Sequence, residues 1–317
     1  MKKLLPCLCL ITLLSGVSLL IAADDKKPAE GKRYLIIHSD DAGMSHNVNL
    51  ATIEGMEKGC VSSCSIMVPC PWFPEFAEYA KKHPEKDYGI HCTLNSEFGG
   101  YRWGPVAGRE KVPSLCDKDG YLFRSKDDVV KYGKPAEVEI ELRAQIDRAK
   151  QFGVKLSHLD THIGTVLATG DFAEVYVRLG LEYDLPVMLI RNIDPQLAAG
   201  YSDLVKKNDA FIAALDEKGL PPIDYLFQFY DGKNHDARQK RYLDTFRKLK
   251  PGVTQMIIHC GYDNSEMQAI SGSHFLRGDD TKIFTDPAVK EEIDKMGIEI
   301  ISWKQLREMQ GKKVSQK

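Results

Sequence analysis

Two adjacent carboxylates follow an apolar run in the stretch YLIIHSDDAG, where Asp40 and Asp41 come directly after residues typical of a buried strand. Like charges a few ångströms apart disfavour each other's ionised form. A divalent metal ion would neutralise the pair, so that one carboxylate could bind the ion while the other accepts a proton from water. The stretch therefore predicts a metal site whose remaining ligands come from elsewhere in the chain.

The same pair has an alternative, structural interpretation as the cap of a following helix. Residues from about His46 to Lys58 have a helical pattern. Asp41 or Ser45 stands where a side-chain oxygen would accept bonds from the first free backbone N–H groups of that helix. The sequence therefore leaves both interpretations of the aspartate pair open, as part of a metal site and as a helix cap.

Three other predicted strand ends carry residues that bind metals or transfer protons. GIHCTLN contains His91, LSHLDTHIG contains His158, Asp160 and His162, and IIHCGYD contains His259. The carboxyl ends of parallel strands converge on one face of a β/α fold, so we expect these residues to meet the adjacent pair at one mouth. Two histidine nitrogens and one carboxylate around an open position are typical of a catalytic divalent site.

The segment HLDTH alternates by two residues, which places His158, Asp160 and His162 on one face of a strand. Only His162 would reach the mouth, while His158 would point deeper and support the layer below. Asp160 would accept a ring N–H and so hold a histidine in place. A single histidine in a strand is more often a core residue, so the metal interpretation depends on the combination with the aspartate pair.

The elements that must position these residues alternate between strands and helices. One helix is predicted in EVEIELRAQIDRAKQFG, where Val138, Leu142, Ile146 and Ala149 share a face and Gly153 ends the pattern. The strand candidates are Tyr34–His38, Ser62–Val68, Tyr88–Leu94, Leu156–Asp160, Pro186–Ile190, Tyr225–Phe229, Gln255–His259 and Ile298–Ser302.

About eight such units predict an α/β fold of the closed or nearly closed (β/α) barrel type. A doubly wound open sheet is the alternative. No GxGxxG stretch follows the first strand, which argues against a dinucleotide-binding version of that sheet.

Residues 96–136 interrupt the alternation with a long segment rich in Gly, Pro and charge. Long loops in compact domains are usually functional, and this one would cover the carboxyl-end face of the barrel. Tyr101 and Trp103 within it could stack on a pyranose ring, since flat apolar rings suit the C–H faces of sugars. The alternative is that both rings pack the loop onto the barrel.

The N-terminus differs from the rest of the 317-residue chain. Lys2 and Lys3 precede an apolar run from Leu4 to about Ala23, which predicts a secretory signal peptide at residues 1–23 and an exported, periplasmic or extracellular protein. A retained membrane anchor is the alternative, whereas cleavage would leave no stable membrane span. Residues 24–317 are predicted to form a single barrel domain.

Composition narrows the classes of partner. A formal net charge of −2 offers no basic surface for nucleic acid. Export permits disulfides among the six cysteines after the signal, but spacing alone does not pair them. No CxxC pair follows the signal, so a cysteine-rich zinc module is not the source of the metal. A homodimer is one possible assembly.

Taken together, the four strand-end stretches resemble those of the YdjC/ChbG-like carbohydrate deacetylases, relatives of the polysaccharide deacetylases with a distorted (β/α) barrel. HSDDAG, GIHCTLN, SHLDTHIG and IIHCGYD occur in the family's order, and the resemblance covers about residues 33 to 305. It implies Asp41, His91 and His162 as metal ligands. It also implies Asp40 as the general base and His259 as the acid that protonates the departing amine.

The chain departs from the family pattern at two places. Ala42 and the pair Ile163 and Gly164 stand where the family often has phenylalanine and further histidines, which bears on the substrate. Cys260 stands where a proline usually follows the late histidine, which bears on the role of His259.

The resemblance implies hydrolysis of an N-acetyl group on a sugar or oligosaccharide by a divalent ion, zinc or magnesium, of which zinc suits two histidines and an aspartate better. Two alternatives remain. The same site could hydrolyse another ester or amide, or the chain could be a carbohydrate-binding protein with a non-catalytic barrel. The presence of both Asp40 and Asp41 argues against a binder, because a binder has little need for a base.

Overall fold

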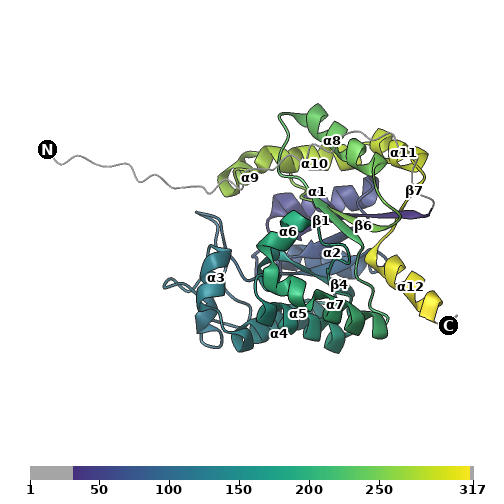
Figure 1. The fold of residues 1–317 in the computed structure, drawn as a ribbon. Coiled ribbons are helices and arrows are strands. Elements are labelled where there is room, and N and C mark those ends of the chain that lie inside the picture. Colours follow the sequence, from purple (N-terminus) through teal and green to yellow (C-terminus); the bar gives the residue numbers. More distant parts are fainter. Residues whose placement is uncertain (1–30, 315–317) are drawn as a thin grey trace.

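The computed structural model describes residues 31–314, so the predicted signal peptide lies outside the described residues (Figure 1). The named strands all pair in parallel, in the order β4-β3-β2-β1-β6-β5, with β7 beside β1. Their bounds are β1 Arg33–Ala42, β2 Ser63–Ile66, β3 Tyr88–Cys92, β4 Leu156–Thr161, β5 Tyr225–Gln228, β6 Gly252–Ile258 and β7 Ile298–Ile300. Seven of the eight predicted strands are thereby confirmed in position.

The eighth predicted strand, Pro186–Ile190, is not a regular strand, yet its backbone closes the barrel. Met188 N–H donates to Leu159 O of β4 at 2.9 Å, and Ile223 N–H, just before β5, donates to Leu189 O at 3.1 Å. Isolated parallel bridges therefore join β4 to β5 across this segment. Pro186 has no N–H to give to a ladder, which is one reason why regular pairing fails. The fold is a distorted (β/α) barrel, and the open-sheet alternative is wrong.

Helices surround the strands, as expected when each strand is followed by a crossover. Figure 1 shows α8, α10 and α11 on one side of the strands and α4, α5 and α7 on the other. The longer helices are α1 His46–Lys58, α2 Phe73–Lys82, α4 Pro135–Gln151, α5 Gly170–Tyr183, α7 Ser202–Glu217, α8 His235–Arg247, α10 His274–Thr285, α11 Pro287–Lys295 and α12 Trp303–Val314. The shorter ones are α3 Lys126–Tyr132, α6 Pro195–Gly200 and α9 Ser265–Ile270.

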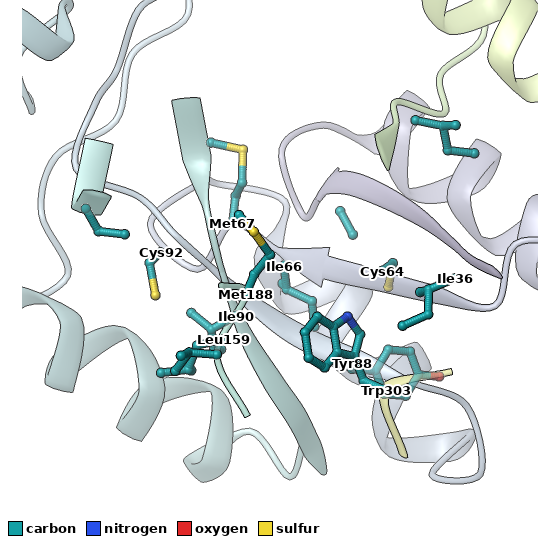
Figure 2. Packing of buried hydrophobic residues seen from close by; sticks show 14 of the residues in the cluster. Ile36, Cys64, Ile66, Met67, Tyr88, Ile90, Cys92, Leu159, Met188 and Trp303 are labelled. Carbon is teal, nitrogen blue, oxygen red and sulfur yellow. The ribbon is translucent and has the colours of Figure 1, made fainter. Parts of the chain in front are cut away.

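Apolar side chains of successive strands pack in one buried core. Figure 2 shows Ile36 of β1, Ile66 of β2, Ile90 of β3 and Leu159 of β4 among them, together with Trp303 from the start of α12. The Trp303 indole is fully buried, and its N–H donates to Gln255 Oε1 at 2.9 Å. The core thus holds the strands in register, so that their carboxyl ends reach the same rim.

Ser45, rather than Asp41, caps helix α1. The Ser45 hydroxyl accepts a hydrogen bond from Val48 N at 3.2 Å. The capping interpretation of the aspartate pair is therefore wrong for Asp41, whose carboxylate is left available for other contacts.

Helix α4 provides a test of the predicted apolar face. Ile146 is fully buried, and we expect Ile146→Ala to lower the free energy of unfolding by about 2–5 kcal/mol, because it leaves a cavity. Ile140 on the same helix is 41% exposed, and Ile140→Ala should stay within about 0.5 kcal/mol of the wild type. Urea unfolding followed by circular dichroism measures both, and equal losses would contradict the assigned face.

Candidate active site

A β-bulge near the end of β1 brings two neighbouring carboxylates to the same side of the strand. Side chains of adjacent strand residues normally point to opposite faces. Between Ser39 and Ala42, however, β1 advances three residues while β2 advances two, and Asp41 adopts a left-handed backbone with φ of 70°. Such a bulge re-aims a side chain. Both Asp40 and Asp41 are buried, and both lie near His91.

Asp41 meets two histidines from other strands. Its Oδ1 lies 3.4 Å from His91 Nε2, at the end of β3, and 3.3 Å from His162 Nδ1, directly after β4. One donor atom from each residue lies within 4.8 Å of the others, and all three side chains are buried. Asp41 Oδ1 has no hydrogen-bond partner although it is buried. An orphaned carboxylate oxygen facing two ring nitrogens fits a divalent cation.

The other oxygen of Asp41 is paired with Arg277 of α10. Arg277 Nη2 lies 2.5 Å from Asp41 Oδ2, and both side chains are buried. Burial alone would raise the pKa of the Asp41 carboxyl, but the charge of Arg277 and the facing rings of His162 and His91 hold it well below its usual range. Asp41 is therefore ionised at neutral pH. Sequence reasoning missed Arg277, which lies in a helix and carries no motif signal.

Each of the two histidines is oriented by a partner on its other ring nitrogen. Ser65 Oγ lies 2.9 Å from His91 Nδ1. Glu97 Oε2 and Oε1 lie 3.1 and 3.2 Å from His162 Nε2. These contacts leave His91 Nε2 and His162 Nδ1 to face Asp41, and a carboxylate behind a metal-binding histidine is a common arrangement. Glu97 was also missed, because one glutamate in a long loop is not distinctive.

The turn after His162 departs from ordinary backbone geometry. Ile163 and Gly164 both have positive φ angles, of 56° and 68°. For a β-branched residue such as isoleucine this conformation is strained, and strain of this kind gathers at functional sites. A Cβ at Gly164 would lie 2.3 Å from the Tyr201 hydroxyl, so this close approach requires glycine. The turn thereby fixes the direction of the His162 ring.

Asp40 lies beside this group and opposite His259. Asp40 Oδ2 is 3.7 Å from His91 Nε2 and 3.9 Å from His259 Nε2. Burial lowers the pKa of His259, which favours the neutral ring. Tyr230 follows β5, and its hydroxyl oxygen lies 3.2 Å from His259 Nε2. Tyr230 is 61% exposed and was not singled out from the sequence.

The remaining residues of HLDTH form a layer under the mouth. His158 is fully buried and stacks on Trp303, with ring centroids 4.9 Å apart. A Cβ on Gly89 of β3 would lie 2.3 Å from His158 Nε2, so glycine is required there. Asp160 Oδ2 lies 2.9 Å from His38 Nε2, and so the histidine that Asp160 supports is His38 of β1.

Tyr101 and Trp103 of the long loop pack against the protein, although the sequence also allowed them to contact a sugar. Trp103 is only 2% exposed, and its indole N–H donates to Asn95 O at 2.7 Å, with its ring 6.4 Å from that of His162. The partly buried Tyr101 donates its hydroxyl proton to Met44 O. The structure thus favours the packing alternative for both rings, and most clearly for Trp103.

A family model described as YdjC-like protein matches residues 34–295. A carbohydrate deacetylase from Thermus thermophilus is 32% identical, over 76% of this chain and 82% of the relative. Another, from Thermoanaerobacter pseudethanolicus, is 27% identical over 82% and 94% of the two chains. The chain belongs to the YdjC-like family.

A solved structure from Enterococcus faecalis V583, described as a candidate cellobiose-phosphate cleavage protein, has a similar fold. It superposes with a TM-score of 0.72 at 26% identity, covering 87% of this chain and 99% of its own. The barrel is therefore shared over almost the whole of that protein.

Glu97 provides a test of the metal site that does not depend on turnover. Glu97→Gln removes the charge behind His162, and we expect the affinity for a divalent ion to fall about 10- to 100-fold. Competition with a chromogenic chelator measures it. Glu110→Gln, an exposed glutamate of the same loop, is the matched control. Equal dissociation constants for the two variants would contradict the assigned contact.

Proposed function

We propose that this chain is a metal-dependent carbohydrate deacetylase that removes N-acetyl groups from an acetylated amino sugar or oligosaccharide. One observation carries the proposal, namely a buried carboxylate, Asp40, between a candidate metal triad and His259. Several relatives are known as carbohydrate deacetylases, which supports the substrate class.

Asp41, His91 and His162 would hold the ion, and their nitrogen and oxygen donors suit zinc better than magnesium. When bound, such an ion polarises the amide carbonyl, lowers the pKa of water and stabilises the negative charge that develops on the carbonyl oxygen. Arg277, on the far oxygen of Asp41, keeps that carboxylate ionised and turned towards the histidines.

Asp40 and His259 move the protons. Asp40 Oδ2 accepts a proton as the water oxygen bonds to the carbonyl carbon. The C–N bond then breaks, and the nitrogen takes a proton from His259, because an amine anion is too poor a leaving group to depart unassisted.

Asp40 and His259 together can carry the proton that leaves the water to the departing nitrogen. Burial favours neutral His259, so the ring must first receive the proton that it gives. Asp40 Oδ2 is 3.9 Å from His259 Nε2, which supports passage of the water proton from Asp40 to His259 and then to nitrogen. One water is consumed, the amine and acetic acid are formed, and both residues return to their starting state.

Two other functions use the same residues and are distinguished by products. A hydrolase of other esters or amides would release acid from O-acetylated sugars or peptide amides in preference to N-acetylated chito-oligosaccharides. A carbohydrate-binding protein would bind without turnover. The experiment is a screen of acetylated glycans with metal-loaded protein, read by acetate release; N-acetylated substrates should react fastest, and no release from any of them would sink the proposal.

Replacement of the base should separate chemistry from metal binding. We expect Asp40→Asn to lower kcat by about 10²- to 10⁴-fold, because the amide cannot accept the water's proton. Metal content, measured by mass spectrometry, should match the wild type. Asp209→Asn, an exposed aspartate of α7, is the control and should keep full turnover. Wild-type kcat in Asp40→Asn would rule out the base assignment.

Chelation should remove both turnover and part of the stability. A ligand that binds only the folded state stabilises it by mass action, so dialysis against a chelator should lower Tm. Added zinc should restore Tm and acetate release together. An unchanged Tm and unchanged turnover after verified metal removal would contradict a metal site at this mouth.

We infer that the mature chain is exported, on the basis of the predicted signal at residues 1–23. Within residues 31–314, no helix combines the length and apolar character needed to cross a membrane. The six described cysteines are all free, and five of them are buried. N-terminal sequencing of protein recovered outside the cytoplasm should begin close to residue 24, whereas an intact leader would support the anchor.

A further inference from the structure

His38 occupies an unusual position for a titratable group, because it is fully buried between two carboxylates. Its Nε2 lies 2.9 Å from Asp160 Oδ2 and 3.3 Å from Asp40 Oδ1. Asp160 is itself held by the backbone N–H of Thr161, which donates to Oδ1 at 2.6 Å, and by the more distant amide of Gln255. Asp160 therefore provides a rigid support under His38.

The other ring nitrogen of His38, Nδ1, acts as a hydrogen-bond donor. Nδ1 lies 2.9 Å from Ser63 Oγ, and the Ser63 hydroxyl donates its single proton to Asp87 Oδ1 at 2.6 Å. Ser63 Oγ must then accept a proton from Nδ1. Nε2 makes no hydrogen bond of good geometry, but it faces Asp160 Oδ2 and Asp40 Oδ1, where a ring lone pair would be repelled and a proton attracted. With protons on both nitrogens His38 is an imidazolium, which supplies the positive charge that two buried carboxylates need.

The electrostatics agree with this hydrogen-bond count. Burial by itself lowers the pKa of His38, but bonds to Asp160 and Asp40 and their negative charges outweigh burial and raise it to about 10. The same interactions with His38 lower the pKa of Asp160, against the effect of burial.

The contacts of Asp40 divide between its two oxygens. Oδ1 lies near His38 Nε2 and accepts from Ser65 Oγ at 3.3 Å. Oδ2 faces His91 Nε2 and His259 Nε2, at 3.7 and 3.9 Å. Oδ1 is thus held by His38 and Ser65, and Oδ2 faces the two histidines beside which the proposed reaction occurs.

We propose that His38 is a positioning residue for the base, with its imidazolium holding Asp40 Oδ1 so that Oδ2 alone receives the proton. This inference rests on the proposed function, because it assigns His38 a role through Asp40. A reaction that depends on the placement of its base is sensitive to small shifts, and a displacement of about 1 Å costs on the order of 10²-fold in rate.

A buried metal site is the competing interpretation of the same residues. Donor atoms of His38, His158 and Asp160 lie within 4.8 Å of one another. However, His38 Nε2 and Asp160 Oδ2 are already in direct contact at 2.9 Å, and His158 Nε2 lies against the backbone of Gly89. His38 Nε2 and His158 Nε2 both lack a hydrogen-bond partner, as Asp41 Oδ1 does, so the metal content measured below distinguishes the two interpretations. The close contact with Asp160 and the bond of Nδ1 to Ser63 favour the imidazolium.

The test compares two replacements of His38 with the wild type. His38→Met removes the donor while keeping a bulky side chain, and we expect kcat for acetate release to fall about 10²-fold with KM close to the wild-type value. His38→Gln keeps an N–H donor and should recover part of kcat. His83→Gln, a histidine at the end of α2, is the control and should match the wild type.

Metal content separates positioning from ligation. One ion per chain in the wild type and in both variants agrees with the proposal, whereas loss of an ion from the His38 variants alone overturns it. Wild-type kcat in a folded His38→Met overturns it as well. If His38→Met does not fold, Asp160→Asn tests the same contact, and a lower kcat at unchanged metal content is expected.

Nuclear magnetic resonance of the ¹⁵N-labelled wild type tests the charge without turnover. Two protonated ring nitrogens assigned to His38, absent in His38→Gln, are expected at neutral pH. A single ring N–H signal overturns the proposal. Absence of acetate release by the wild type with both N–H signals present would instead overturn the proposed function and leave the charged His38 established.

Discussion

Burial of negative charge is the constraint on which the rest of the structure depends. Asp40, Asp41 and Asp160 are all buried, and unpaired carboxylates are costly in the interior of a protein. Arg277 takes one oxygen of Asp41, and His38 lies between Asp40 and Asp160. These contacts leave two oxygens without a cationic partner: Asp41 Oδ1, which faces His91 and His162, and Asp40 Oδ2, which faces the proposed proton path. The reaction proposed for this site depends on which carboxylate oxygens have no cationic partner.

Unusual backbone conformations set the directions in which Asp40, Asp41 and His162 point. A regular strand would send Asp40 and Asp41 to opposite faces, and the bulge in β1 turns both towards His91. Across the mouth, the left-handed turn at Ile163 and Gly164 directs His162 towards Asp41. Strained conformations persist only where the surrounding structure holds them, which the closed barrel does here.

Support for the site comes from layers that do not touch a substrate. Under the mouth, His158 stacks on Trp303, and the missing side chain of Gly89 makes room for its ring. Beside the mouth, the long loop contributes Glu97 behind His162 and the buried ring of Trp103 near it. An aromatic residue of a loop beside the candidate site can therefore support the side chains of that site rather than contact a substrate.

Periodicity and strand ends in the sequence were enough to predict seven strands, helix α1 to the residue and the convergence of the strand-end residues, whereas the choice of Asp41, His91 and His162 as a set came from the family resemblance. The strands and the helix follow from local patterns of apolar residues. The strand-end residues meet because the parallel topology places every strand end at one rim. The irregular closure at residues 186–190, the pairing of Arg277 with Asp41 and the charge on His38 were decided by tertiary structure. Each of these features depends on which backbone or side-chain group lies next to it in the folded chain. The partners are far apart in the sequence, so local sequence patterns do not identify them.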